Sequence, residues 1–323
     1  MKTNVNLSGL ELDNPVIPAS GTFGFGYEFA DLYDINCLGS IALKGTTRDA
    51  RFGNPTPRIA ECTDGLINSV GLQTPGVDRV IAEELPKLAK VFQKPAIANV
   101  SGFSVEDYAV VCEKLDREEQ IGLLEVNISC PNVHNGGMSF GTDPKSAAEV
   151  TAAVKAVTTK PVYMKLSPNV TDIAEIACAC KEAGADGISL INTLMGMRIS
   201  LNTKQPVIAN KMGGFSGPAI FPVAVRMVWQ VYEATGLPII GMGGVSGADS
   251  SGMNSDDLSS ASIDAILSRS SAASSNSSRR MDSSRPLRSR SSSRRMLIRS
   301  ETAGSCHCST VSGGVLPQWT LPW

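Results

Sequence analysis

Two lysines and three asparagines stand where an apolar run of the sequence ends, at positions from which side chains could act on a small ligand. Lys44 and Lys165 supply positive charges that suit a phosphate or an anionic ring. Asn99, Asn127 and Asn192 each carry both a hydrogen-bond donor and an acceptor, which suits a heterocycle with amide-like edges. Together they indicate a binding site for a charged ring compound.

Cys130, in the stretch "NISCPN" (127–132), is a candidate base or nucleophile. A free thiol titrates near pH ~8.5, so a modest fraction is thiolate at neutral pH. A small residue that fills a strand end is the alternative, and the residues alone leave both open. His134 lies close by, but in the glycine-rich "NVHNGGMSFG", which we interpret as a flap over the site.

Two glycine-rich stretches, "GMGGV" (241–245) and "GGFSGPA" (213–219), offer bare backbone amides. Such amides bind phosphate in many enzymes, although a glycine turn is often only a turn. We expect both stretches to be loops. In combination with the lysines they indicate a cofactor that carries a phosphate.

Short apolar runs that end in small or polar residues predict seven strands, separated by stretches with helical spacing. The predicted strands are 15–21, 40–45, 95–102, 123–131, 161–168, 187–193 and 237–245, and the clearest helical patterns cover 77–92, 143–157 and 172–185. Strands that are apolar on both faces and alternate with helices favour a parallel sheet.

We predict an α/β fold of the (β/α)8 TIM barrel type. No GxGxxG follows the first strand, which argues against an open dinucleotide-binding sheet. Polar groups or glycine end most strands, at the rim where barrel enzymes place their sites. An eighth strand is due ~25–30 residues after the seventh. The sequence there is rich in serine and arginine, so the barrel is predicted to lack its eighth strand and last helix.

Composition changes near residue 247, which predicts a barrel at 1–247 and a low-complexity tail at 248–323. The tail has too little apolar surface to offset the entropy of ordering. It could be a basic arm that binds nucleic acid, a disordered tail, or a shifted reading frame in which alanine codons are read as serine; we favour the shifted frame. "CHC" (306–308) supplies too few ligands for a metal site.

The overall numbers suit a globular protein that acts in the cytoplasm. Of 323 residues, 42% are hydrophobic and 19% are charged, and the net charge of −2 gives no reason to expect nucleic acid or an anionic membrane as partner. No apolar run approaches the ~20 residues of a membrane span. The N-terminus has no apolar signal core, and the eight cysteines are scattered as in reduced proteins.

Several stretches, in order between residues 5 and 246, resemble the catalytic subunits of class 1B dihydroorotate dehydrogenases, the NAD-linked type. The matching stretches are "NPVIPASGTFGFG", "LKGTTRDARFGNPTPR", "GLINSVGLQTPG", "ANVSG", "EVNISCPNV", "GGMSFGT", "VYMKLSPNVTDI", "INTLMGMRI", "GGFSGPA" and "PIIGMGGVS". The combination of "NISCPN" with "FGNPTPR" and "INSVGLQ" is highly specific, and the resemblance covers about three quarters of the chain.

The resemblance implies an FMN-containing barrel that oxidises (S)-dihydroorotate to orotate in pyrimidine (UMP) biosynthesis. Cys130 would be the base that removes the C5 proton while hydride leaves C6 for the flavin N5, and residues 46–71 would cover the pocket. The implied substrate-binding residues are Lys44, Asn68, Ser69, Val70, Gly71, Leu72, Asn127, Asn192 and Thr193. The implied FMN-binding residues are Ser20, Gly21, Lys44, Gly45, Asn99, Asn127, Lys165, Ile191, Gly217, Gly243 and Gly244.

Electrons must then leave the flavin, and the sequence has no four-cysteine cluster with iron–sulfur spacing. The resemblance implies a second subunit, carrying FAD and a [2Fe-2S] cluster, that passes electrons to NAD+ in a heterotetramer of two catalytic and two electron-transfer subunits. The fumarate-linked class 1A enzyme, a dihydropyrimidine dehydrogenase-like flavin barrel, and an inactive remnant with a nucleic-acid-binding tail are the alternatives.

The end of the chain departs from the family. The final strand, with its glycine pair beside the FMN phosphate, is missing from the sequence, and so is the closing helix. If the tail is translated as written, we expect weak FMN binding, aggregation or no stable fold.

Overall fold

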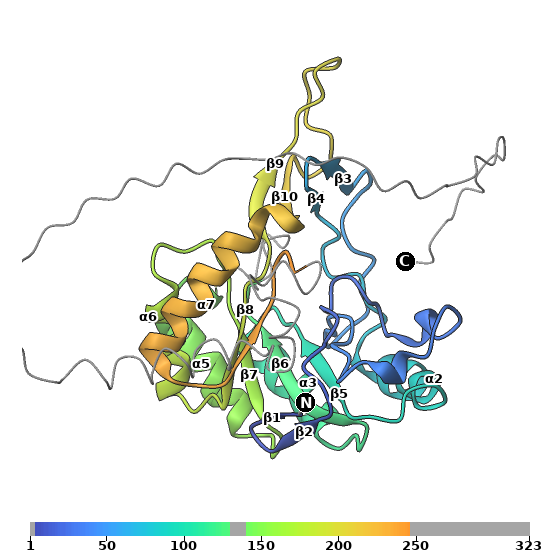
Figure 1. Ribbon diagram of the computed structural model, residues 1–323, viewed down its shortest axis with the longest axis vertical. Coiled ribbons are helices and arrows are strands. Elements are labelled where there is room, and N and C mark those ends of the chain that lie inside the picture. The colour runs from blue at the N-terminus through green and yellow to red at the C-terminus, as the bar shows by residue number, and fades with distance from the viewer. Residues whose placement is uncertain (1–3, 130–139, 246–323) are drawn as a thin grey trace, which may run out of the picture. The chain divides into compact units, whose positions relative to one another are not determined.

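The computed structural model describes residues 4–129 and 140–245. These residues form a five-stranded sheet, a four-stranded sheet and a two-stranded hairpin. Helices α5, α6 and α7 lie beside strands β6, β7 and β8, as Figure 1 shows. Cys130 and His134 fall outside the described residues, as does the tail at 248–323.

The five-stranded sheet is parallel, and its strands lie in chain order. They are β5 (Ala96–Val100), β6 (Ile121–Asn127), β7 (Val162–Lys165), β8 (Gly187–Leu190) and β11 (Ile239–Gly241). Parallel bridges from Ala42 to Ile97 and from Thr46 to Val100 add the predicted 40–45 strand beside β5. This succession of parallel strands and helices confirms the α/β barrel-type fold.

The prediction of a strand at 15–21 is wrong. In the structure this segment is irregular and turn-like, although the Val16 carbonyl accepts a hydrogen bond from the Gly39 amide at 2.9 Å. Pro15 and Pro18 have no N–H group to donate to a ladder. Apolar content alone therefore overstated the strand character of this stretch.

Four long helices of the described residues connect these strands, and consecutive members of this set pack against one another. They are α3 (Val105–Asp116), α5 (Pro144–Lys155), α6 (Ile173–Glu182) and α7 (Phe221–Thr235). The side chains of Ser104, Asp143 and Asp172 cap three of them by accepting from backbone amides of the first turn. The helical patterns predicted at 143–157 and 172–185 therefore correspond to α5 and α6.

The helix predicted at 77–92 is present but interrupted. It consists of α1 (Val77–Arg79), a π-helical turn η3 (Val80–Glu84) and α2 (Leu85–Ala89). Pro86 stands at the beginning of α2, where its missing N–H breaks the regular bonding of an α-helix. The amphipathic spacing predicted the buried face and not the change of helix type.

The interior of the parallel sheet is layered. Side chains alternate along each strand, so residues two apart face the same side. One interior layer is apolar and contains Leu7, Leu12, Ala42, Ile97, Leu123 and Tyr163. Leu7 and Leu12 belong to the hairpin of β1 (Val5–Leu7) and β2 (Leu10–Leu12), which therefore packs against this end of the interior. Two residues further along the strands the interior becomes polar.

The antiparallel sheet has the order β3 (Ile59–Cys62), β4 (Gly65–Asn68), β10 (Met212–Ser216) and β9 (Leu194–Met197). The prediction of a loop at 213–219 is therefore wrong for 213–216. Glycine permits close strand approach here, because a Cβ on Gly214 would lie 1.9 Å from Thr193 Oγ1. Gly217, with φ of 124°, begins the turn into η4 (Pro218–Ile220).

No helix within 4–129 or 140–245 combines the length and the apolar character that crossing a membrane requires.

Candidate active site

The polar interior layer is centred on Glu125, whose side chain is buried. Its Oε1 accepts a hydrogen bond from Ser189 Oγ at 2.7 Å, and its Oε2 lies 3.3 Å from Lys165 Nζ. Asn99 Nδ2 also donates to Oε2. Strands β5, β6, β7 and β8 each contribute one of these four side chains. A buried ion pair is tolerated when its remaining hydrogen-bonding groups are satisfied, as the carboxylate is here.

The sequence predicted Asn99 and Lys165 for the site and missed Glu125 and Ser189. The alternation of side chains along the strand could have identified Glu125, because it lies two residues from both Leu123 and Asn127 and therefore faces the same side of the sheet as they do. A charge at the centre of an apolar strand, in register with two interior positions, must be paired inside the fold.

Gly45, Asn99 and Leu72 meet next to this layer. A Cβ on Gly45 would lie 3.0 Å from Asn99 Oδ1 and 3.4 Å from both Leu72 Cδ2 and Ser101 Oγ. Asn99 Oδ1 and Ser101 Oγ are buried and have no hydrogen-bond partner in the described part of the chain. Buried polar atoms are normally satisfied, so this pair suits a ligand with polar edges. Ser101 is a residue that the sequence reasoning missed.

The two predicted lysines lie at this end of the sheet. Lys165 is 5% exposed, and its Nζ lies 3.5 Å from Ser20 Oγ, which joins Ser20 to the polar layer. Lys44 is half-buried, and its backbone amide donates to the Gly24 carbonyl at 2.7 Å. Gly21 follows Ser20 on an exposed turn.

Asn127, Ser129 and Asn192 form a hydrogen-bonded group at the carboxyl ends of β6 and β8. Ser129 Oγ donates to Asn127 Oδ1 at 2.9 Å and accepts from Asn192 Nδ2 at 2.7 Å. Asn192 Nδ2 also lies 3.2 Å from Asn127 Oδ1. The structure therefore brings together the two asparagines that the sequence predicted and adds a buried serine between them.

The predicted glycine sites meet at the start of α7. Gly243 and Gly244 have φ of 120° and 78°, a backbone region that favours glycine. A Cβ on Gly244 would lie 2.7 Å from the Gly217 carbonyl oxygen, and one on Gly243 would lie 3.1 Å from Ile191 Cγ1. The backbones of Gly217 and Gly244, 27 residues apart in the sequence, thus approach each other closely.

Residues 68–72 lie beside the same rim. Asn68 Nδ2 approaches the Gly214 carbonyl oxygen at 3.5 Å, and Gly214 in turn packs against Thr193. Within the segment, Ser69 is buried and accepts from Asn210 Nδ2 at 2.8 Å, Val70 is half-buried, and Gly71 has φ of 78°. The predicted substrate residues 68–72 and 193 are therefore neighbours in space.

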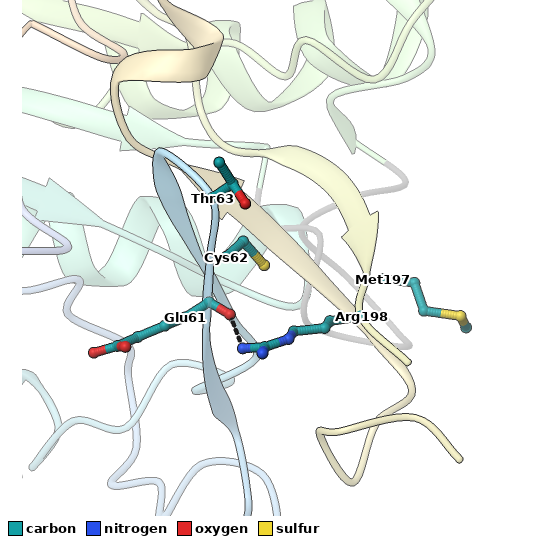
Figure 2. A pocket seen from close by; sticks show the side chains of 5 residues that line it. All are labelled: Glu61, Cys62, Thr63, Met197 and Arg198. Carbon is teal, nitrogen blue, oxygen red and sulfur yellow. Dashed lines mark hydrogen bonds between the residues drawn. The ribbon is translucent and has the colours of Figure 1, made fainter. Parts of the chain in front are cut away.

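An open depression on the antiparallel sheet is separate from this set of residues. It is lined by Glu61, Cys62, Thr63, Met197 and Arg198, and the Arg198 guanidinium donates to the Glu61 carbonyl, as Figure 2 shows. None of the predicted site residues lines it, so we assign it no part in the chemistry.

Comparison with known proteins places these observations in a family. The family model described as "Dihydroorotate dehydrogenase" matches residues 2–253. The chain is 58% identical over 246 residues to the "Dihydroorotate dehydrogenase B (NAD(+)), catalytic subunit" of Bacillus pumilus, covering 76% of this chain and 79% of the relative. The protein of the same name from Enterococcus faecalis is 57% identical over 245 residues, covering 76% and 78%.

A solved structure supports the fold. The dihydroorotate dehydrogenase of Eimeria tenella, crystallised in complex with ferulenol, superposes with a TM-score of 0.63 at 20% identity, covering 77% of this chain and 75% of that one. At this identity the likeness concerns the fold alone. The sequence matches carry the assignment: the chain belongs to the dihydroorotate dehydrogenase family of oxidoreductases.

Proposed function

We propose that the chain is the FMN-dependent catalytic subunit of an NAD-linked dihydroorotate dehydrogenase, which oxidises (S)-dihydroorotate to orotate for pyrimidine biosynthesis. The observation that carries the proposal is the polar interior layer, in which Glu125 joins the buried Lys165 to Asn99, and in which Asn99 Oδ1 and nearby Ser101 Oγ have no hydrogen-bond partner among residues 4–129 and 140–245. The names of the relatives support the substrate and the acceptor.

The residues present fit FMN. Asn99 and Ser101 offer buried oxygens without a partner in the described part of the chain, beside Gly45, where the missing side chain leaves room for a ring edge. Ser20 and Lys165 would complete this side, with Gly21 and Lys44 nearby. Gly217, Gly243 and Gly244, beside Ile191, would present backbone amides to the phosphate. When bound, FMN supplies the hydride acceptor, a role that no amino-acid side chain fills.

The substrate would be held by the rim. Asn127, Asn192 and Thr193 offer hydrogen-bonding groups at one side, and Asn68, Ser69, Val70, Gly71 and Leu72 close the other. Orotate has a carboxylate and ring imides, which amide side chains and backbone groups match in both directions. Lys44 would place a positive charge near both the substrate and the cofactor.

Cys130 would be the base that takes the C5 proton. It follows Ser129 directly in the sequence, three residues after Asn127, where β6 ends. A thiolate can accept a carbon-bound proton and pass it on near neutral pH. The side chain itself lies outside the described residues, so sequence position and the resemblance support this role.

A partner subunit would carry the electrons onward. The relatives are named catalytic subunits, which supports the existence of a further subunit. We propose that this partner holds FAD and a [2Fe-2S] cluster, reduces NAD+, and assembles with the chain as a heterotetramer of two subunits of each kind.

The test combines cofactor binding with one substitution. The full chain should bind FMN weakly, because the final strand beside the phosphate is missing from the sequence. At saturating FMN it should show flavin absorption, which dihydroorotate should bleach under anaerobic conditions. Cys130→Ser should slow this reduction by about 10²-fold or more and move its pH optimum upward, because a hydroxyl is a far poorer base. An unchanged rate at pH 7 would rule out the role of Cys130. Turnover with fumarate, and none with NAD+ in the presence of the partner, would identify the class 1A reaction instead.

A further inference from the structure

Ser129 occupies a position between the two asparagines of the rim that the proposed reaction does not itself explain. Its side chain is fully buried, at 0% exposure. Its hydroxyl donates to Asn127 Oδ1 at 2.9 Å and accepts from Asn192 Nδ2 at 2.7 Å. One hydroxyl therefore uses both of its hydrogen-bonding functions on the two amides.

Two backbone amides fix which atom of each side chain is the oxygen. The Ser129 N–H lies 3.2 Å from Asn127 Oδ1, and the Thr193 N–H lies 2.8 Å from Asn192 Oδ1. A backbone N–H can only donate, so each must face an oxygen. The opposite edge of Asn192 is then its NH2 group, which points at Ser129 and Asn127.

These contacts leave Asn127 with one edge for a ligand. Its Oδ1 already accepts from Ser129 N, Ser129 Oγ and Asn192 Nδ2, which exceeds the two lone pairs of an amide oxygen. Its Nδ2 has no hydrogen-bond partner among residues 4–129 and 140–245. Asn127 is therefore oriented as a donor toward the site.

We infer that Ser129 is a positioning residue, which locks Asn127 and Asn192 so that Asn127 presents its NH2 group to an acceptor oxygen of the substrate, a carboxylate or a ring carbonyl. This inference rests on the proposed function, because it concerns the same rim. Being fully buried, Ser129 acts through the two asparagines. Without its hydroxyl, Asn192 Nδ2 loses its shortest bond and Asn127 Oδ1 loses one of its three donors.

The test measures orotate affinity in the FMN-loaded full chain, by titration followed through the flavin absorption. Ser129→Ala should weaken orotate binding about tenfold at saturating FMN, with a melting temperature matching that of the control. Ser40→Ala is that control, because Ser40 is equally buried and donates a single bond to the Pro95 carbonyl at 2.8 Å. Ser129→Thr keeps the hydroxyl and should bind orotate about fivefold more tightly than the alanine variant.

The outcomes separate this inference from the proposed function. A wild-type chain that takes up FMN but shows no response to orotate overturns both. A wild-type chain that binds orotate, with Ser129→Ala binding within twofold of it, overturns the positioning role alone, as do alanine and threonine variants of equal affinity. If Ser129→Ala does not fold, the threonine variant is compared with wild type, and a loss beyond tenfold decides against the role.

Discussion

Glu125 shows how much of the site depends on single side chains. It is 1% exposed, and three donors from three neighbouring strands converge on its carboxylate. Removing one partner of a buried ion pair leaves the other charge without compensation, which typically costs about 3–5 kcal/mol. Replacing both partners with uncharged groups costs far less. The pair is therefore tested best by changing its members separately and together.

We expect Glu125→Gln to lower the free energy of unfolding by about 3 kcal/mol or more, because Lys165 loses its counter-charge. The double variant Glu125→Gln/Lys165→Met should recover most of that loss. Denaturant unfolding of the cofactor-free protein measures both.

Glu113→Gln is the matched control for this experiment. Glu113 pairs with Arg117 on the surface of α3, and an exposed pair of this kind contributes about 0.5 kcal/mol or less. If Glu125→Gln and Glu113→Gln lower the free energy of unfolding equally, the buried Glu125–Lys165 pair contributes no more to stability than an exposed pair.

The sequence predicted part of this site and not the rest. Asn99, Lys165 and Asn192 could be predicted because they stand at strand ends, where barrel enzymes place their chemistry. Glu125 lies in the middle of a strand and Ser189 and Ser129 are small polar residues of ordinary type. Their importance comes from the side chains that they contact on other strands. Those neighbours can be identified only when the register of the sheet is known.

At the scale of elements, strands were predicted correctly where a run of residues is continuously buried. They were predicted wrongly where proline or glycine determines the conformation of the backbone. Strands β5, β6 and β7 are buried and largely apolar, and they overlap the predicted ranges, although β6 begins two residues before the predicted 123. The stretch at 15–21 is equally apolar, yet its prolines exclude it from the ladder. The β9–β10 strand pair was missed, because its glycines give no periodic signal and suggest a loop.

The end of α3 illustrates how one side chain joins two elements. The Asp116 carboxylate accepts bonds from the backbone amides of Thr159 and Lys160 at 2.9 and 3.1 Å, and from the Thr158 hydroxyl. Burial acts to raise the pKa of Asp116, but these hydrogen bonds outweigh it and lower the pKa overall. A lowered pKa in the folded protein means that the charged form stabilises the fold.

We expect Asp116→Asn to lower the free energy of unfolding by about 1 kcal/mol at pH 7, because hydrogen bonds to a charged acceptor are lost. The stabilisation is fully present above the unfolded-state pKa of about 3.9 and disappears as pH falls through the lower folded-state value. The difference between variant and wild type should therefore shrink below pH 4, as measured by urea unfolding at several pH values.

Asp78→Asn provides the comparison, because Asp78 pairs with Lys114 on the surface and is 76% exposed. Its loss should stay within about 0.5 kcal/mol. If Asp116→Asn lowers the free energy of unfolding by the same amount at pH 7 and pH 3, the stabilisation does not depend on the charge of Asp116, and the argument from its lowered pKa is wrong.

At the scale of the whole molecule, the family match and the composition concern different parts of the chain. The family model covers residues 2–253, whereas serine and arginine dominate from about residue 248 onward. The division into a barrel at 1–247 and a tail at 248–323 remains a prediction, and so does the shifted reading frame. The nucleotide sequence near codon 247 decides the second question directly.

We expect deletion of residues 248–323 to leave FMN affinity within twofold of that of the full chain, because a segment of this composition buries little apolar surface. Flavin titration of both chains measures this. If the full chain instead binds RNA in a salt-dependent manner and the shortened chain does not, the tail is a genuine nucleic-acid-binding arm.

The outermost strand β11 of the parallel sheet has a consequence for handling the protein. Within residues 4–129 and 140–245, the segment 42–46 pairs with β5 and also donates through the Lys44 amide to the Gly24 carbonyl on the side away from β5, whereas β11 pairs along one side only, with β8. Rows of amide and carbonyl groups on the other side are templates for strands of neighbouring molecules. Aggregation should therefore increase when the sample is concentrated and decrease when it is diluted. A peptide that pairs with the open edge as a strand should also reduce it.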